Sequence, residues 1–117
     1  MAIALNTLVD SWHDSKRLHV ILTPTFSGSY LTGGDTLSFA GVKGVLSSQP
    51  PVECVAHGNS GHLYEFVFGT TIANGKLMVR IATTTSGNLG LSEHSAAAYD
   101  ATVTADVVRI HAIFKLR

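Results

Sequence analysis

The chain of 117 residues is 45% apolar and only 14% charged, and its formal net charge at pH 7 is zero. This length allows one domain with a substantial core. The balanced charge gives no electrostatic attraction to nucleic acid or to an acidic membrane. The single cysteine, Cys54, excludes an internal disulfide. Because globular proteins carry roughly 25% charged residues, so few charges suggest that part of the surface is buried against a partner subunit.

Neither a membrane anchor nor a secretory leader is expected. No stretch of the sequence reaches the ~20 apolar residues that a membrane-spanning helix needs. The first ten residues lack the positive region of a signal peptide, and polar residues soon interrupt their apolar run. We therefore expect a protein that is made in the cytoplasm and stays unanchored.

The first 16 residues have a mixed pattern. Their apolar side chains have partly helical spacing, which polar residues interrupt. This pattern predicts a short helix, or an arm that becomes ordered against a neighbour, over residues 1–16, followed by a single β-sandwich domain over residues 17–117. Trp12, the only tryptophan, is either part of the core or an anchor at an interface.

Three strands are predicted in the first half of the domain. Residues 17–23 alternate apolar and polar side chains, as expected for a strand with one buried face, and this strand should end at Pro24. Shorter strands are predicted at residues 36–40 and 51–57, on either side of a loop.

The next two strands should form a hairpin. Residues 62–68 read as a strand, and Asn74-Gly75 is the strongest hairpin signal in the chain, because both residues tolerate the positive φ of a type I′ turn. We expect this turn to join a strand that reaches about Ala73 to a strand over residues 76–83.

The C-terminal strand has the clearest pattern in the chain. Residues 93–99 could form one helical turn or a loop, and a two-residue repeat then runs through residues 105–117. One face of this strand is apolar and consists of Val108, Ile110, Ala112, Phe114 and Leu116. The other is polar and basic and consists of Arg109, His111, Lys115 and Arg117, with Ile113 as an apolar exception.

These elements together predict an all-β fold. We expect a small β-sandwich or jelly-roll-like fold of about 6–8 short antiparallel strands, because short strands alternate with turns and no long helix is indicated. The N-terminal arm or short helix would precede this domain.

Six histidines raise the question of a metal site. His57 and His62 are the candidates, with Glu65 nearby in the sequence, and His94 and His111 could converge on them. Cupins separate two ligand histidines by one residue, whereas four residues separate His57 from His62. On a strand, His62 and Glu65 would also lie on opposite faces. We therefore expect no metal and no cofactor.

Catalytic motifs are also absent from the sequence. It contains no phosphate-binding or dinucleotide-binding glycine pattern, and no two acidic residues are spaced as an acid/base pair. The expectation is that the protein is not an enzyme.

Short segments over roughly the C-terminal two-thirds of the chain carry a family resemblance. They are residues 33–37 (GGDTL), 64–66 (YEF), 74–79 (NGKLMV), 96–99 (AAAY) and 106–114 (DVVRIHAIF). In this combination the chain resembles the small decoration (cement) proteins of tailed-bacteriophage heads, particularly those with a jelly-roll-like β fold. The first 30 residues lie outside this resemblance.

The resemblance implies a structural, non-enzymatic protein of the virion. Such a protein is made in the host cytoplasm, binds the outer surface of the capsid where capsomers meet, and stabilises the shell. Its partners would be the major capsid protein and further copies of itself, in a homodimer or homotrimer. Repetition over a symmetric lattice would multiply a modest affinity per copy.

Candidate interface residues come from both ends of the chain. They are Leu5, Leu8 and Trp12 from the N-terminal segment and Arg109, Lys115 and Arg117 from the basic face of the last strand. The basic residues could contact an acidic surface of a partner or simply face water.

Two other functions remain open at this point. One is a tail, baseplate or carbohydrate-binding β-sandwich, in which Tyr30, Tyr64 or Tyr99 would form an exposed aromatic platform. The other is a cupin-like metal-binding protein that uses the histidines named above.

Overall fold

The computed structural model describes residues 3–82, 91–94 and 96–117, with side chains for all of them except residues 5–7, 82, 91 and 92. Strands account for 51% of the residues and helix for 4%, so the fold is all-β, as predicted. The elements in chain order are β1 (Ile3–Asp14), β2 (Arg17–Phe26), β3 (Asp35–Leu37), β4 (Glu53–His57), β5 (Leu63–Val67), β6 (Gly75–Ala82), β7 (Leu91–Glu93), α1 (Ala101–Thr104) and β8 (Arg109–Lys115).

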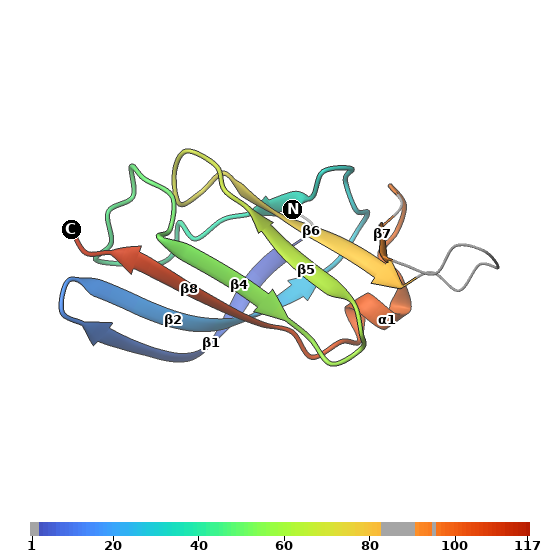
Figure 1. The fold of residues 1–117 in the computed structure, drawn as a ribbon, viewed down its shortest axis with the longest axis horizontal. Coiled ribbons are helices and arrows are strands. Elements are labelled where there is room, and N and C mark those ends of the chain that lie inside the picture. Colours follow the sequence, from blue (N-terminus) through green and yellow to red (C-terminus); the bar gives the residue numbers. More distant parts are fainter. Residues whose placement is uncertain (1–2, 83–90, 95) are drawn as a thin grey trace.

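The strands form one antiparallel sheet that curls around a single core (Figure 1). Their order is β1-β2-β8-β4-β5-β6-β3, and β7 pairs with β6 outside this path. The two ends of the order, β1 and β3, approach each other, but the described residues form no ladder between them. The result is a nearly closed, barrel-like sandwich with dimensions of 50 × 23 × 23 Å.

β8 lies between β2 and β4 and supplies the centre of the core. Its apolar face is buried as predicted, since Ile110 and Ala112 have no exposed surface and Phe114 has 1%. On the opposite face Arg109 and Lys115 are exposed to solvent. The two-residue repeat in the sequence therefore identified both faces of this strand correctly.

The N-terminal segment is a strand and not the short helix considered above. β1 pairs with β2 along its length, and Ile3 at its start is 1% exposed within the core. Two register shifts, between Leu5 and Thr7 and between Leu8 and Asp10, insert extra residues into the ladder. Such bulges reverse the inward and outward alternation, which explains why the sequence shows no clean two-residue repeat here.

β2 is longer than predicted and continues through Pro24 to Phe26. Its pairing with β8 ends at Leu22, so Pro24 lies beyond that ladder. Proline is tolerated in a strand where no neighbouring strand lies on the side that its missing N–H would face, and at Pro24 only β1 continues as a neighbour. The strand therefore has no reason to stop at Pro24.

The predicted two-residue hairpin at Asn74-Gly75 is wrong. β5 and β6 are neighbours, but a loop over residues 68–74 connects them. The Oδ1 atom of Asn74 accepts hydrogen bonds from the backbone N–H groups of Thr70 (2.8 Å) and Thr71 (2.9 Å). Asn74 thus closes a wider loop through its side chain.

The one described helix, α1, begins after the range that was considered for a helical turn. Asp100 caps it by accepting a hydrogen bond from the N–H of Thr102 at 3.0 Å. Residue 95 and the predicted end of the β6 strand at residue 83 lie outside the described residues, as does most of the loop at 86–91. Within the described residues, no helix has the length and apolar character needed to cross a membrane.

Candidate functional site

The hairpin of β1 and β2 carries most of the surface features that suggest a function. Asp14 pairs with Arg17 across a two-residue turn, and Ser15 in this turn has a φ of 57°. Positive φ values in such a turn match the right-handed twist of the strands. The hairpin is therefore a continuous extension of the sheet, at the end of the molecule where the C-terminus lies (Figure 1).

Aromatic rings are stacked on the outer face of this hairpin. The Trp12 ring lies parallel to that of His19, with centroids 4.8 Å apart and an interplanar angle of 9°. The Nδ1 atom of His19 is 3.3 Å from Nε2 of His111 on β8, and Asp14 lies 3.8 Å from the other ring nitrogen of His19. Trp12 thus has one ring face covered by His19, and 39% of its surface remains exposed.

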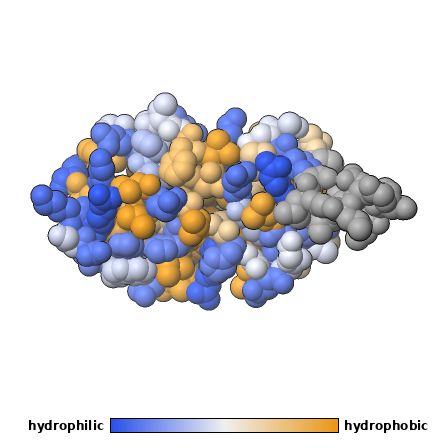
Figure 2. Space-filling model, viewed as in Figure 1, coloured by the Kyte–Doolittle hydropathy of each residue, from blue (hydrophilic) through white to orange (hydrophobic). Residues whose placement is uncertain are grey.

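The second half of β1 exposes several large apolar side chains. Leu8, Val9 and Trp12 are 57%, 41% and 39% exposed. Apolar side chains are also exposed on β5, where Leu63 and Val67 are 44% and 38% exposed, and the face drawn in Figure 2 carries orange residues among blue ones. Long edge strands with exposed apolar side chains are sites at which other chains add to a sheet.

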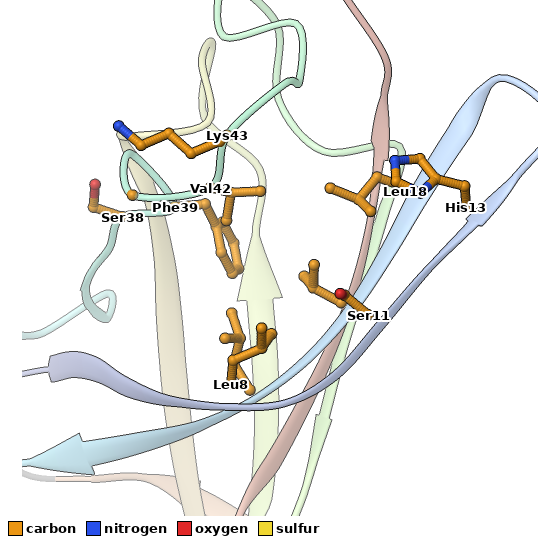
Figure 3. A pocket seen from close by; sticks show the side chains of 11 residues that line it. Leu8, Ser11, His13, Leu18, Ser38, Phe39, Val42 and Lys43 are labelled. Atoms are coloured by element: carbon orange, nitrogen blue, oxygen red, sulfur yellow. The ribbon is translucent and has the colours of Figure 1, made fainter.

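A hollow lies beside this strand, on the inner face of the hairpin. It has a volume of about 580 Å³ and is bounded by β1, β2 and residues 38–43, which follow β3. Figure 3 shows Leu8, Leu18, Phe39 and Val42 pointing into the space between the hairpin and this loop. Ser11, His13 and Lys43 add polar groups around the apolar lining.

Basic residues gather at the same end of the molecule. Arg17 pairs with Lys115 across β2 and β8, the N–H of Leu116 donates to the carbonyl of Lys16, and the N–H of Arg117 donates to the carbonyl of Gly44. These contacts place five of the eight lysines and arginines near the hairpin turn, namely Lys16, Arg17, Lys43, Lys115 and Arg117.

The six predicted interface residues do not form one patch. Trp12, Lys115 and Arg117 come together at the hairpin end, and Leu8 lies further along β1 beside the hollow. Arg109 is separated from them by the length of β8 and pairs instead with His57. Leu5 belongs to β1, but its side chain lies outside the described residues.

The histidines named as possible metal ligands are dispersed. His57 is exposed at the end of β4, whereas Nε2 of His62 lies 2.9 Å from Oγ1 of Thr102. Glu65 is paired with Arg80 at 3.4 Å. Among the described residues no group of three or more His, Cys, Asp or Glu side chains is arranged to hold a metal ion.

The three tyrosines form no exposed platform, in contrast to the second function considered above. Tyr30, Tyr64 and Tyr99 are 1%, 4% and 8% exposed. Each donates its phenolic O–H to a carboxylate: Tyr30 to Glu93 at 2.6 Å, Tyr64 to Asp106 at 2.7 Å, and Tyr99 to Asp35. The pKa of all three phenols is raised above the ordinary value of 10. Burial is the larger cause, and these hydrogen bonds are the next.

Sequence reasoning missed Ser11, His13 and Lys43, which border the hollow. Ser11 and His13 lie on β1, where the bulges hide the alternation, and Lys43 lies in a loop that only the curling of the sheet brings opposite the hairpin. A strand assignment for β1 would have placed Ser11 and His13 on one face. No sequence pattern indicates the position of Lys43.

Comparison with known proteins does not assign the chain to a family. No protein-family model, curated protein or solved structure matches it.

Proposed function

We propose that this chain is a structural interaction protein, most concretely a decoration protein on the outer surface of a tailed-phage head. In this role it binds where capsomers meet, contacts the major capsid protein and further copies of itself, and stabilises the shell without catalysing a reaction. The observation that carries the proposal is the set of exposed apolar side chains on the second half of β1, beside a hollow with an apolar lining. The resemblance in residues 33–37 and 106–114 supports it.

The surface chemistry of the hairpin end fits a permanent protein partner. Leu8 and Trp12 offer apolar area for burial, and basic residues such as Lys115 and Arg117 surround the turn. An interface of this composition combines a hydrophobic centre with a charged rim that orients the partner. On a capsid lattice, modest affinity at each copy suffices because the contact is repeated.

The first test is fractionation of the native source on a density gradient, with the chain located by mass spectrometry. A decoration protein co-migrates with capsids at a fixed, high copy number relative to the shell protein. Recovery of the chain only at the top of the gradient, as a free small protein, would exclude the decoration function.

The second test uses recombinant chain and capsids stripped of it. Leu8→Asp and Trp12→Ala should each lower capsid occupancy, because both side chains are exposed on the hairpin. Leu63→Asp is the matched control, since Leu63 is 44% exposed on β5, away from the hairpin. A truncation of residues 1–15 would not separate binding from folding, because it removes Ile3 from the core.

A carbohydrate-binding or tail module is a second candidate, and the exposed ring of Trp12 is the observation that favours it. Exposed aromatic rings bind sugars by stacking on their apolar faces. Glycan-array binding that disappears in Trp12→Ala would support this candidate, whereas a blank array together with capsid co-migration would reject it.

A further inference from the structure

The outer edge of β1 and the hollow lie next to each other on one side of the sheet. The strand order ends at β1 and at β3, and the described residues place no strand between them. The hollow opens in this gap, between the second half of β1 and residues 38–43. An added strand at this point would extend the sheet from β1 and cover the hollow at once.

The outer edge of β1 has the backbone groups that such a strand needs. Antiparallel ladders alternate hydrogen-bonded and non-bonded pairs. Because Asp14 and Arg17 close a two-residue turn as a bonded pair, Ser11 and His13 direct their backbone groups away from β2. The N–H of Ser11 donates to Oδ1 of Asp10 at 2.8 Å and not to β2, so an added strand would replace this exposed side-chain acceptor with a backbone carbonyl. The side chains of Ser11 and His13 line the hollow.

We infer that the edge of β1 over residues 8–14 accepts an extended segment of a partner protein by strand addition. The segment pairs with the main chain at Ser11 and His13 and places every second side chain in the hollow. This inference rests on the proposed function, in which the segment belongs to the shell protein. Seven residues of strand span about 23 Å, so the partner contributes a segment of about seven residues.

The lining of the hollow determines the chemistry of that segment. Its floor consists of apolar side chains, including Leu18, Val20 and Leu22 of β2, which requires small or branched apolar residues at alternate positions. Lys43 and His13 lie at the rim, and Lys43 makes no ion pair within the described part of the chain. Figure 3 shows these two side chains on opposite sides of the hollow, so acidic residues at the two ends of the segment would complement them.

A second copy of β1 suits the edge less well. Antiparallel pairing of two β1 strands about Trp12 places Asp10 against Asp14, and pairing about Ser11 places Leu8 against Asp14. Like charges directly opposite each other destabilise a ladder. In the register about Trp12 the like charges disfavour a second copy, and pairing with a second copy in another register is an outcome that the test below distinguishes.

The test is NMR titration of the full ¹⁵N-labelled chain with the peptide Ac-ETVTVTE-NH2, whose inward face presents Glu, Val, Val and Glu in either orientation. Chemical-shift changes should be confined to the amides of residues 8–14 and 38–43, and hydrogen exchange at Ser11 should slow. Ac-ETPTPTE-NH2 should produce neither effect, because proline cannot donate to the ladder.

Variants of the chain test the apolar contact and the charge contact with the peptide separately. Leu8→Asp should abolish the shifts, and Leu63→Asp should leave them unchanged. Lys43→Glu should weaken binding of the acidic peptide roughly fivefold or more and strengthen binding of Ac-KTVTVTK-NH2. The reversal of charge preference distinguishes an ion pair at the rim from a general loss of structure.

The inference is overturned if about 2 mM acidic peptide leaves residues 8–14 unshifted, or if the proline peptide shifts them equally. It is also overturned if the free chain sediments as a dimer with these amides already protected, since a second copy would then occupy the edge. The density-gradient result is independent of both outcomes. Capsid co-migration without peptide binding would retain the decoration function and reject strand addition.

Discussion

The hydrogen bonds between tyrosines and carboxylates are the main polar contacts inside this core. Tyr99 pairs with Asp35, which is 3% exposed, whereas Tyr64 pairs with Asp106, which is only partly buried. Asp106 also accepts a hydrogen bond from the N–H of Asn59 at 2.8 Å. A carboxylate that loses its donor costs more free energy where water cannot replace the bond.

Tyr99→Phe should therefore destabilise the protein more than Tyr64→Phe does. We expect a loss of about 2–3 kcal/mol in the free energy of unfolding for Tyr99→Phe and about 1 kcal/mol for Tyr64→Phe. Urea unfolding monitored by circular dichroism gives both values. The opposite order would show that Asp35 finds another donor in the core.

Cys54 provides a second prediction about a single residue. Cys54 lies on β4 and is 5% exposed. Its pKa is raised to about 12, mainly by burial and to a smaller extent by the negative charge of Glu53. Because the thiolate is the reactive form, native Cys54 at pH 8 should react with iodoacetamide more than about a hundredfold more slowly than in urea. Mass spectrometry of alkylated chain measures both rates. Equal rates would mean that β4 opens readily.

At the scale of elements, the sequence identified strands that obey a simple repeat. β8 was predicted with both faces correct because its apolar side chains alternate without interruption from Val108 to Phe114. β1 was not predicted because two bulges reverse its alternation. The Asn74-Gly75 pair suggested a tight hairpin, but the Asn74 side chain bonds to Thr70 and Thr71 instead.

The candidate site was less predictable than the fold, because it depends on how the sheet closes. Trp12 was named as an interface candidate as the only tryptophan and Lys115 as part of the basic face of the last strand, and the structure places both at the hairpin end. The hollow requires residues 38–43 to lie opposite β1. No local pattern encodes that approach, since the curling of the whole sheet produces it.

Gly34 marks a second place where elements approach closely. It has a φ of +106°, and a Cβ atom there would lie 2.8 Å from the carbonyl oxygen of Leu77 on β6. Gly28 also has a positive φ, of +72°, but a Cβ atom would meet nothing within 4 Å. Gly28→Ala therefore carries only the backbone cost of a left-handed residue, about 1 kcal/mol, whereas Gly34→Ala adds a φ further from the left-handed region and a steric overlap.

We expect Gly34→Ala to lower the free energy of unfolding by more than about 3 kcal/mol, or to prevent folding. Gly28→Ala is the matched control and should lower it by about 1 kcal/mol. Thermal unfolding of both variants measures the difference. Equal losses would show that β3 and β6 separate enough to accommodate the extra methyl group.

For the whole molecule, Glu93, Asp106 and the three buried phenols contribute to the pH dependence of stability. Hydrogen bonds from Tyr30 and from the N–H of Gly33 lower the pKa of Glu93. Burial alone would raise the pKa of Asp106, but hydrogen bonds led by that of Tyr64 lower it. A lowered pKa stabilises the folded state above the ordinary carboxyl value of about 4, and this contribution is lost as the pH falls through the folded value.

The phenols act in the opposite direction, because their raised pKa values favour the protonated folded state. Their contribution is complete below the ordinary tyrosine pKa of about 10 and is lost as the pH rises above it. The urea midpoint should therefore be nearly constant between about pH 5 and pH 9 and fall on both sides. Tyr64→Phe should flatten the alkaline decline, because one buried phenol no longer ionises on unfolding. An alkaline decline that is unchanged in Tyr64→Phe would show that another group causes it.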